Sequence, residues 1–354
     1  MVKVIKAETI EKDDDLAILK KVISLPNNFC FSTPTRSIKS SMQKDSLRSD
    51  SIINEVVKRV DINFLESLEE GATSRVTREI RASCLTNKLN LVIFDLIFDT
   101  VPNETLIRTL SQQIYSSSDI CIFLPTVRKA LFSEIPQFRK TPKFSDRKFG
   151  KYLDMMETII NDIIEVGNNK PFIGTIPFIP IKYARQIINL YYQKGITSFA
   201  IDANTRDVLS NEADLRDILS EINRKIRLPD AFIYACNLGY PRYDDLVARA
   251  DDFLSIFAYI DVMGGTFKIK GFSNKPPRKK KFSKNEYRYE IVQSHYPPRN
   301  ELEVFNHREQ LAEAHKVKQL LGEENIKQYI NEKPAVDRLT MKKLESIASN
   351  VRIS

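Results

Sequence analysis

The stretch PFIGTIPFIPIKYARQIINLYYQKGITSFAI, residues 171–201, decides the fold prediction for this chain. Its first residues, 171–176, are apolar and fit a short buried strand. Apolar residues at helical spacing then predict a helix over 181–193, and Gly195 ends it ahead of a second strand at 196–201. A strand, a helix and a second strand in this order form a right-handed crossover unit with parallel strands.

The same alternation continues on both sides of this stretch. The spacing of apolar residues predicts helices over 149–166, 211–225 and 243–256, and strands over 28–32, 89–94, 119–124, 231–236 and 257–262. Seven or eight strands separated by helices fit a (β/α)8 barrel of the TIM type better than an open doubly wound sheet. The predicted fold class is therefore α/β, a (β/α)8 barrel with a basic loop and a C-terminal helical extension.

Three segments are expected along the chain. The catalytic barrel would occupy residues 1–265, and a basic loop or insertion would occupy 266–299. Helices that pack on the barrel would occupy 300–354, with one long helical region over 300–330 and a short one over 339–348.

Composition excludes several classes of protein. The 354 residues are 42% hydrophobic and 28% charged, which is typical of a globular protein. The longest apolar run, near 89–98, is interrupted by Asp95 and is too short to span a bilayer, and the charged N-terminal residues lack a signal-peptide core. We therefore expect a soluble cytoplasmic protein with no membrane contact.

Cysteine, histidine and glycine usage narrows the chemistry further. The four cysteines are scattered without a CxxC pair, so neither a zinc site nor a disulfide framework is indicated. The three histidines, His295, His307 and His315, all lie in the last sixth of the chain, so the barrel lacks a histidine for a Ser-His-Asp or Cys-His site. No GxGxxG or Walker-type loop follows a strand. Carboxylates remain the obvious acids, bases and nucleophiles.

Positive charge is concentrated in residues 268–288, KIKGFSNKPPRKKKFSKNEYR, which carry nine Lys and Arg residues and a single acid, Glu286. Proline, glycine and asparagine favour an exposed loop, and the interleaved aromatic rings could stack on unpaired bases. This pattern predicts nucleic-acid contact, and a solvated basic loop is the alternative. The residues expected to contact phosphates are Arg36, Lys275, Arg278, Lys279, Lys280, Lys281 and Lys284.

Polar residues that follow apolar strands are the candidate site residues, because barrel sites lie where strands end. These residues are Asp95, Thr175, Asp202, Asn237 and Asp261. Each aspartate could instead be a helix N-cap or a loop ion pair, and for Asp202 that alternative is about equally good. Asp95 and Asp261 stand among apolar residues, where a carboxylate without a partner is costly.

The order of several motifs resembles the tRNA-guanine transglycosylase family, including the relatives that insert 7-deazaguanine bases into DNA. The resemblance lies in residues 31–37 (FSTPTRS), 172–177 (FIGTIP), 195–202 (GITSFAID), 235–241 (ACNLGYP) and 305–329. The family's zinc-binding cysteines have no counterpart here, and Phe305 stands at the position of its zinc-binding histidine. The resemblance therefore implies a member without zinc or any other cofactor.

The resemblance implies a reaction in which an aspartate displaces guanine from a nucleoside and a 7-deazaguanine base replaces it. Asp261 would be the nucleophile, with Asp252 in the motif at 250–255 as the second candidate, and Asp95 would be the general acid and base. The base would be held by Thr175, Asp202, Asn237 and Gly239.

Three functions remain open. The first is the base exchange just described, in which the nucleic acid could be tRNA or DNA and a homodimer or a helper protein could take part. The alternative to an enzyme of this family is a catalytically inactive relative that binds nucleic acid or acts as a scaffold. A third possibility is an unrelated barrel enzyme that uses metal-bound carboxylates on a phosphorylated substrate.

Overall fold

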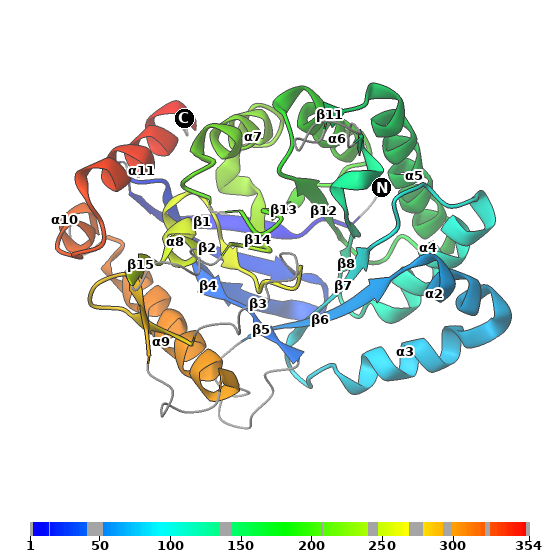
Figure 1. Cartoon of the computed structure of the whole chain (residues 1–354), viewed down its shortest axis with the longest axis horizontal. Helices are drawn as coiled ribbons and strands as arrows, with labels where there is room; N and C mark the ends of the chain where they lie inside the picture. The colour runs from blue at the N-terminus through cyan, green and yellow to red at the C-terminus, as the bar shows by residue number, and fades with distance from the viewer. Residues whose placement is uncertain are drawn as a thin grey trace.

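The computed structural model describes residues 3–13, 15–40, 52–134, 143–206, 208–239, 247–268, 279–292, 299–322 and 326–351. Two parallel sheets lie at the centre of the molecule (Figure 1). The six-stranded sheet has the order β4 (Thr35–Arg36), β16 (Val262–Met263), β14 (Phe232–Cys236), β13 (Ser198–Asp202), β12 (Phe172–Pro177) and β8 (Ile122–Phe123). The four-stranded sheet has the order β5 (Ile38–Lys39), β6 (Ile53–Val60), β7 (Leu89–Leu96) and β9 (Thr126–Val127).

Helices connect the parallel strands, as the alternating sequence pattern requires. They are α2 (Ile62–Ser67), α3 (Thr73–Ala82), α4 (Glu104–Ser117), α5 (Asp146–Val166), α6 (Ile181–Gln193) and α7 (Glu212–Lys225). Short 3-10 turns are η1 (Pro26–Asn28), η4 (Lys129–Leu131), η5 (Leu228–Asp230) and η6 (Ser255–Phe257), and η3 (Leu68–Ala72) is a π-helical turn after α2. Figure 1 shows α2 to α7 on the outside of the strands.

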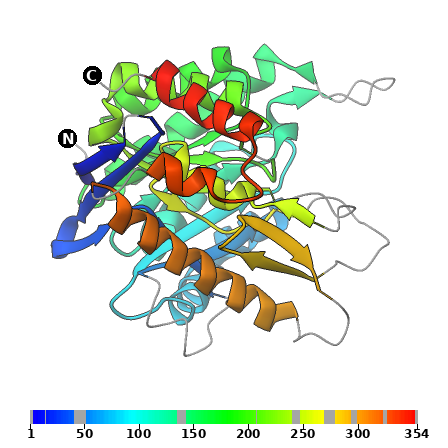
Figure 2. The same cartoon turned by 90° about the vertical axis from the view of Figure 1, so that its left-hand side faces the viewer.

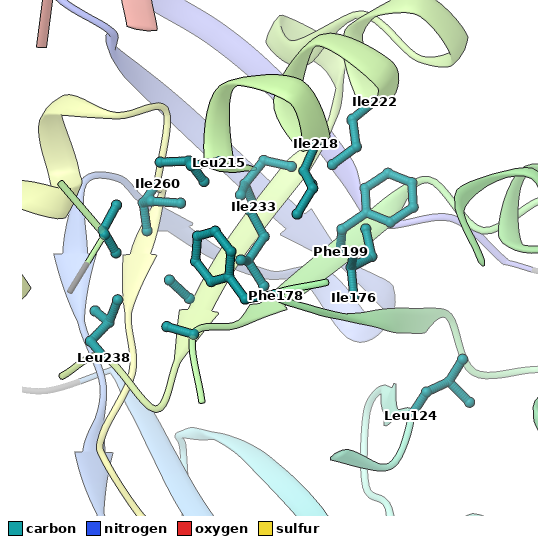
Figure 3. Close-up of a cluster of buried hydrophobic side chains, with 14 of the residues drawn as sticks. Leu124, Ile176, Phe178, Phe199, Leu215, Ile218, Ile222, Ile233, Leu238 and Ile260 are labelled. Atoms are coloured by element: carbon teal, nitrogen blue, oxygen red, sulfur yellow. The ribbon is translucent and has the colours of Figure 1, made fainter. Parts of the chain in front are cut away.

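Apolar side chains are buried on both faces of the strands. On β7, Phe94 and Leu96 belong to the large core that packs against the helices, whereas Leu91 and Ile93 belong to a separate buried cluster. Successive residues of a strand point to opposite faces, so both faces of this strand are covered. Figure 3 shows the helix side of the core, where α7 places Leu215, Ile218 and Ile222 over the strands. Burial on both faces explains why these strands read as continuous apolar runs.

Antiparallel sheets and further helices complete the molecule. The N-terminal sheet contains β1 (Lys6–Asp13), β2 (Ile18–Leu25) and β3 (Phe29–Ser32), and a short pair joins β10 (Ser133–Glu134) to β11 (Lys143–Phe144). A third sheet has the order β15 (Val247–Arg249), β18 (Arg288–Ile291) and β17 (Lys280–Ser283). The remaining helices are α8 (Asp251–Leu254), α9 (Arg299–Leu320), α10 (Ile326–Asn331) and α11 (Arg338–Val351). Figure 2 shows the β17–β18 hairpin lying along α9.

The sequence predicted the middle of the chain well. The helix over 181–193 is confirmed, and the strands expected at 171–176, 196–201 and 231–236 are confirmed to within two residues. The long C-terminal helical region is confirmed as α9 and α10, with Gly322 in a left-handed conformation after α9. The short helix expected over 339–348 is confirmed as part of α11. No helix within the described residues is both long and apolar enough to cross a membrane.

Two predicted elements are wrong. Of the helix expected over 243–256, residues 243–246 lie outside the described residues; within the described part, Val247–Arg249 form a strand and Asp251–Leu254 a helix. The strand expected over 257–262 contains only Val262 of the observed β16, because Ser255–Phe257 form a 3-10 turn. Residues 250–262 are buried, and a short buried apolar run has the same composition in a strand, a turn or a helix.

The basic segment also differs from its prediction. Instead of a continuous exposed loop, residues 280–283 and 288–291 form the β17–β18 hairpin. Residues 269–278, which include Lys275 and Arg278, lie outside the described residues.

Candidate functional site

Asp95 and Asp202 meet at Lys268. Asp95 is the penultimate residue of β7 and Asp202 is the last residue of β13, so both stand where parallel strands end. The Lys268 Nζ atom lies 2.5 Å from Asp202 Oδ2 and 3.9 Å from Asp95 Oδ1, and it donates to the carbonyl oxygen of Val127 at 2.9 Å. Thr126 donates its hydroxyl to Asp95 Oδ1 at 2.8 Å. These four side chains, Asp95, Thr126, Asp202 and Lys268, are joined by direct contacts and are called the acidic site below.

Asn237 fixes the position of Lys268 relative to Asp202. It follows β14 and adopts a left-handed backbone conformation with φ of 53°, which asparagine tolerates better than most residues. Its Nδ2 donates to Asp202 Oδ1 at 2.9 Å, and its Oδ1 accepts from the backbone N–H groups of Phe267 and Lys268, each at 3.0 Å. One side chain therefore joins the ends of two strands to the segment that carries the lysine.

The two carboxylates have different surroundings. Burial raises the pKa of Asp95, and the charge of Lys268 and the Thr126 hydroxyl only partly offset this effect. Burial disfavours the charged form of Lys268, but the negative charges of Asp202 and Asp95 outweigh the effect of burial and raise the pKa of Lys268. Asp202 accepts hydrogen bonds from Lys268, Asn237 and the backbone N–H of Asn204.

This difference suits two distinct chemical roles. A buried carboxylate with a raised pKa can carry a proton, whereas a carboxylate held in place by several hydrogen-bond donors can act as a nucleophile or stabilise positive charge. The oxygens of Asp95 and Asp202 that face Lys268 can be no farther apart than the sum of their distances to Nζ. That bound lies below the separation of about 6.5–9.5 Å found in inverting glycosidases and allows the separation of about 5–5.5 Å found in retaining ones.

Further basic side chains lie close to the acidic site. Burial and the charge of Arg206 lower the pKa of Lys129 to about 8, and the charges of Asp202 and Lys268 also act on it. The Nη2 atom of Arg59 donates to the carbonyl of Phe267 at 3.1 Å, and its charge acts on Asp95. The surroundings of the acidic pair are therefore rich in cations.

Glu55 is a buried carboxylate that the sequence pattern does not single out. It is the third residue of β6 and fully buried. Its Oε1 accepts the Ser37 hydroxyl at 2.7 Å and the Gly265 N–H at 2.9 Å. A Cβ atom on Gly265 would lie 2.7 Å from Glu55 Oε2, so a glycine is needed for this approach. A glutamate inside a strand carries no signal in the sequence, because half-exposed strands also contain glutamate.

Glu55 provides a test by pH. Burial raises its pKa, and the Ser37 and Gly265 hydrogen bonds and the charges of Lys39 and Arg36 only partly offset this. A raised folded-state pKa costs stability as pH rises from the unfolded value through the folded one. As the pH rises from 4 to 8, we expect the free energy of unfolding of Glu55→Gln to increase relative to that of the wild type. The expected increase is roughly 1.4 kcal/mol for each unit by which folding raises the Glu55 pKa in the wild type. Urea unfolding at a series of pH values measures this, and a difference that is flat or opposite in sign would contradict it.

Thr175 and Gly239 have structural partners. Thr175 donates its hydroxyl to the carbonyl of Leu124 at 2.5 Å, so its hydrogen atom is engaged within the protein. Gly239 lies against the backbone that follows β13, and its N–H donates to the carbonyl of Arg206 at 2.9 Å. Among the described residues, neither one is hydrogen-bonded to a side chain of the acidic site, and their role in holding a base stays a prediction.

Gly239 is expected to tolerate no side chain. A Cβ atom there would lie 2.4 Å from the carbonyl oxygen of Thr205, and backbone cannot move aside as a flexible side chain can. We expect Gly239→Ala to lower the free energy of unfolding by about 1–3 kcal/mol. Chemical denaturation measures the change, with Gly150→Ala on α5 as the control because a Cβ there meets nothing within 4 Å. Equal stability of the two variants would contradict the expectation.

Asp261 does not belong to the acidic site. The prediction that it follows a strand is wrong, because β16 begins at Val262 and Asp261 precedes it. Its Oδ2 lies 3.0 Å from Lys21 Nζ and accepts the Ile233 N–H at 2.7 Å. Lys21 also donates to the carbonyls of Leu228 and Ala231, which precede β14. Asp261 thus lies where strands begin, whereas Asp95 and Asp202 lie where strands end.

Asp252 and Arg36 lie together in another buried network. Tyr289 donates its hydroxyl to Asp252 Oδ2 at 2.7 Å, and Gln310 Nε2 donates to the same atom at 3.2 Å. Arg36 donates to Gln310 and lies 3.8 Å from Asp252. Only 8% of the Arg36 surface is exposed, so its predicted contact with nucleic acid is not available in this conformation. These contacts join β4, α8, β18 and α9.

The described part of the basic segment is less open than expected. Phe282, Tyr287 and Tyr289 are fully buried and cannot stack on bases from their present positions. Lys284 lies 3.1 Å from Glu309, and Lys281 lies over the ring of Phe305. Partly exposed cations in the described part of the segment are Lys268, Lys279, Lys280, Lys281, Lys284 and Arg288.

Two of the cavities formed by described residues are large, and the acidic site lines neither of them. One of about 500 Å³ lies between α4 and α5 and includes Asp99, Lys148 and Lys151. The other, of about 400 Å³, lies beside α9. Within the described ranges, no three His, Cys, Asp or Glu side chains gather closely enough to hold a metal ion.

Comparison with known proteins identifies no relative. The sequence matches no protein-family model, and a search of curated proteins gives no match.

Proposed function

We propose that this chain is a transglycosylase that exchanges guanine in nucleic acid for a 7-deazaguanine base, with Asp202 as the nucleophile and Asp95 as the general acid and base. The observation that carries the proposal is the pair of buried carboxylates held at the ends of parallel strands by one lysine. The resemblance of the motifs supplies the reaction and the base. The nucleophile is reassigned from Asp261, because that residue is paired with Lys21 where the strands begin.

Two displacements would complete the exchange. In the first, a carboxylate oxygen of Asp202 bonds to C1′ while the bond from C1′ to the guanine nitrogen breaks, and Asp95 supplies a proton to the departing base. In the second, the ring nitrogen of the 7-deazaguanine attacks C1′, its proton passes to Asp95, and Asp202 is released. The two steps restore both carboxylates and conserve every proton.

The cations around the acidic site support a polyanionic substrate. Lys129 is close enough to Asp202 for their charges to interact, and cations neutralise the phosphates on either side of a base that has left its stack. The hairpin lysines Lys279, Lys280 and Lys281 would add contacts farther along the strand. Whether the strand is RNA or DNA is a question for the exchange assay.

We further propose that the two parallel sheets are parts of a single (β/α)8 barrel. Only Ser37 separates β4 from β5, and only Leu124 and Pro125 separate β8 from β9, so each edge of one sheet continues into an edge of the other. If the two sheets join at these edges, the strands occupy eight positions around a closed circuit. In order these are β4 with β5, then β6, β7, β8 with β9, β12, β13, β14 and β16. The separate cluster that contains Leu91, Ile93 and Tyr234 would then fill the interior of the barrel.

Incorporation of labelled guanine tests the proposed reaction. Purified wild-type protein would be incubated with radiolabelled guanine and either tRNA or duplex DNA. Label that becomes acid-precipitable in one polymer supports the proposal. Absence of exchange into either polymer, from protein that binds them, would contradict it.

A catalytically inactive, nucleic-acid-binding relative is the second candidate. The observation that favours it is the 2.5 Å contact of Lys268 with Asp202, which already neutralises the proposed nucleophile. Such a protein is expected to bind tRNA or DNA without exchanging guanine. Its Asp202→Asn variant is expected to bind as well as the wild type.

A further inference from the structure

The cavity of about 400 Å³ lies between α9 and the beginnings of β4 and β6. Side chains of α9 form one wall, and the other wall comes from the end of β3, the start of β4 and the residue before β6. The lining residues on α9 are Arg308, Leu311, Ala312, His315 and Lys318, and those on the other wall are Phe31, Ser32, Pro34, Thr35 and Ile52. A volume of this size is within the range of small-molecule sites.

This cavity is far from the acidic site along the strands. The N–H of Thr35 donates to the carbonyl of Asp261, which stands before β16, and Ile52 stands before β6. These residues are therefore at the beginnings of parallel strands, whereas Asp95 and Asp202 stand at their ends. A ligand in the cavity would occupy a second site.

The charge of the cavity is positive. Arg308, His315 and Lys318 are basic, and none of the lining residues is acidic. Lys318 is half-buried, and its Nζ donates to the hydroxyl of Ser32 at 2.9 Å. Among the described residues, no carboxylate comes within ion-pair distance of Lys318 or Arg308. A half-buried lysine held by a hydroxyl can bind an anion without first breaking an ion pair.

Burial and the charge of Lys20 lower the pKa of Lys318. Lys20 itself is paired with Glu11 at 2.8 Å. An anion beside Lys318 would reverse this effect, because an opposite charge favours the ammonium form.

We infer that this cavity binds a small phosphate ester about the size of a mononucleotide, with its phosphate beside Lys318 and Ser32. A phosphate monoester carries close to two negative charges at neutral pH, which suits a cavity whose charged lining residues are all basic. The organic part packs against the apolar lining residues Phe31, Leu311 and Ile52. This site does not depend on the proposed base exchange.

Isothermal titration calorimetry tests the inference with three probes: inorganic phosphate, a nucleoside 5′-monophosphate and a short single-stranded oligonucleotide without a terminal phosphate. The monophosphate is expected to bind more tightly than inorganic phosphate, because only it contacts the apolar lining. Lys318→Met should weaken its binding about tenfold or more, as expected for a lost charge-assisted hydrogen bond. Ala312→Phe keeps every charge but fills the cavity, and should weaken binding similarly.

Lys342→Met is the matched control, since Lys342 is an exposed lysine on α11 outside the cavity. Its affinity for the monophosphate should equal that of the wild type. Three results would overturn the inference: no binding of the monophosphate to the wild type, binding that neither Lys318→Met nor Ala312→Phe weakens, or binding of the oligonucleotide alone. Circular dichroism and thermal unfolding establish that each variant is folded before titration.

Discussion

Replacement of Asp202 by asparagine is expected to lower the rate of guanine exchange by roughly a thousandfold or more. An amide cannot form the glycosyl ester that the proposed reaction requires, and loss of a nucleophile is among the largest single effects in enzymes. Asp95→Asn should cost roughly 10²- to 10⁴-fold, as is typical for a general acid and base. Single-turnover exchange with labelled guanine measures both effects.

The control is Glu66→Gln, which changes an exposed carboxylate on α2 to an amide. Its exchange rate should match that of the wild type. Asp202→Asn keeps an oxygen acceptor, so its melting temperature serves to separate loss of chemistry from loss of fold. A variant at Asp202 that retains exchange within tenfold of the wild type would contradict its role as the nucleophile.

Replacement of Lys21 by methionine is expected to lower the free energy of unfolding by about 3–5 kcal/mol. Lys21 is fully buried in the middle of β2, and its ammonium group contacts Asp261 and the carbonyls of Leu228 and Ala231. Burial lowers the pKa of Lys21 and raises that of Asp261, so each charge depends on the other for compensation. Methionine would leave a buried carboxylate without its cation. Urea unfolding measures the loss.

Two further variants isolate the cause of this loss. Lys20→Met removes the neighbouring lysine, whose ion pair with Glu11 is partly exposed, and should cost no more than about 1 kcal/mol. In the double variant Lys21→Met, Asp261→Asn, the carboxylate charge is gone as well, and part of the stability should return. Equal losses in Lys20→Met and Lys21→Met would contradict a buried ion pair between strand beginnings.

The sequence predicted the acidic site in part. A carboxylate that directly follows an apolar strand is recognisable, because parallel strands end on one side of their sheet. This reasoning selected Asp95 and Asp202, which the structure brings together at Lys268. It failed for Asp261, because the apolar residues before it form a buried turn and not a strand.

The remaining charged partners carry no local signal. Lys268 is the first cation of a segment for which the sequence predicts nucleic-acid contact, and nothing in the sequence around Lys21 marks it as buried. Glu55 stands between Asn54 and Val56 in β6, and neither neighbour marks it as buried. Only the packing of distant segments shows that Lys268 reaches Asp202 and that Lys21 reaches Asp261. Such long-range pairs cannot be read from spacing along one strand.

The most direct test of the acidic site is to identify the residue that becomes attached to nucleic acid. The wild type and Asp95→Asn would be incubated with substrate polymer, quenched in acid, digested with nuclease and protease, and analysed by mass spectrometry. We predict a ribosyl or deoxyribosyl ester on the peptide that contains Asp202, absent in Asp202→Asn. An ester on a peptide that contains Asp252 or Asp261 instead, or turnover without any ester, would contradict the assignment.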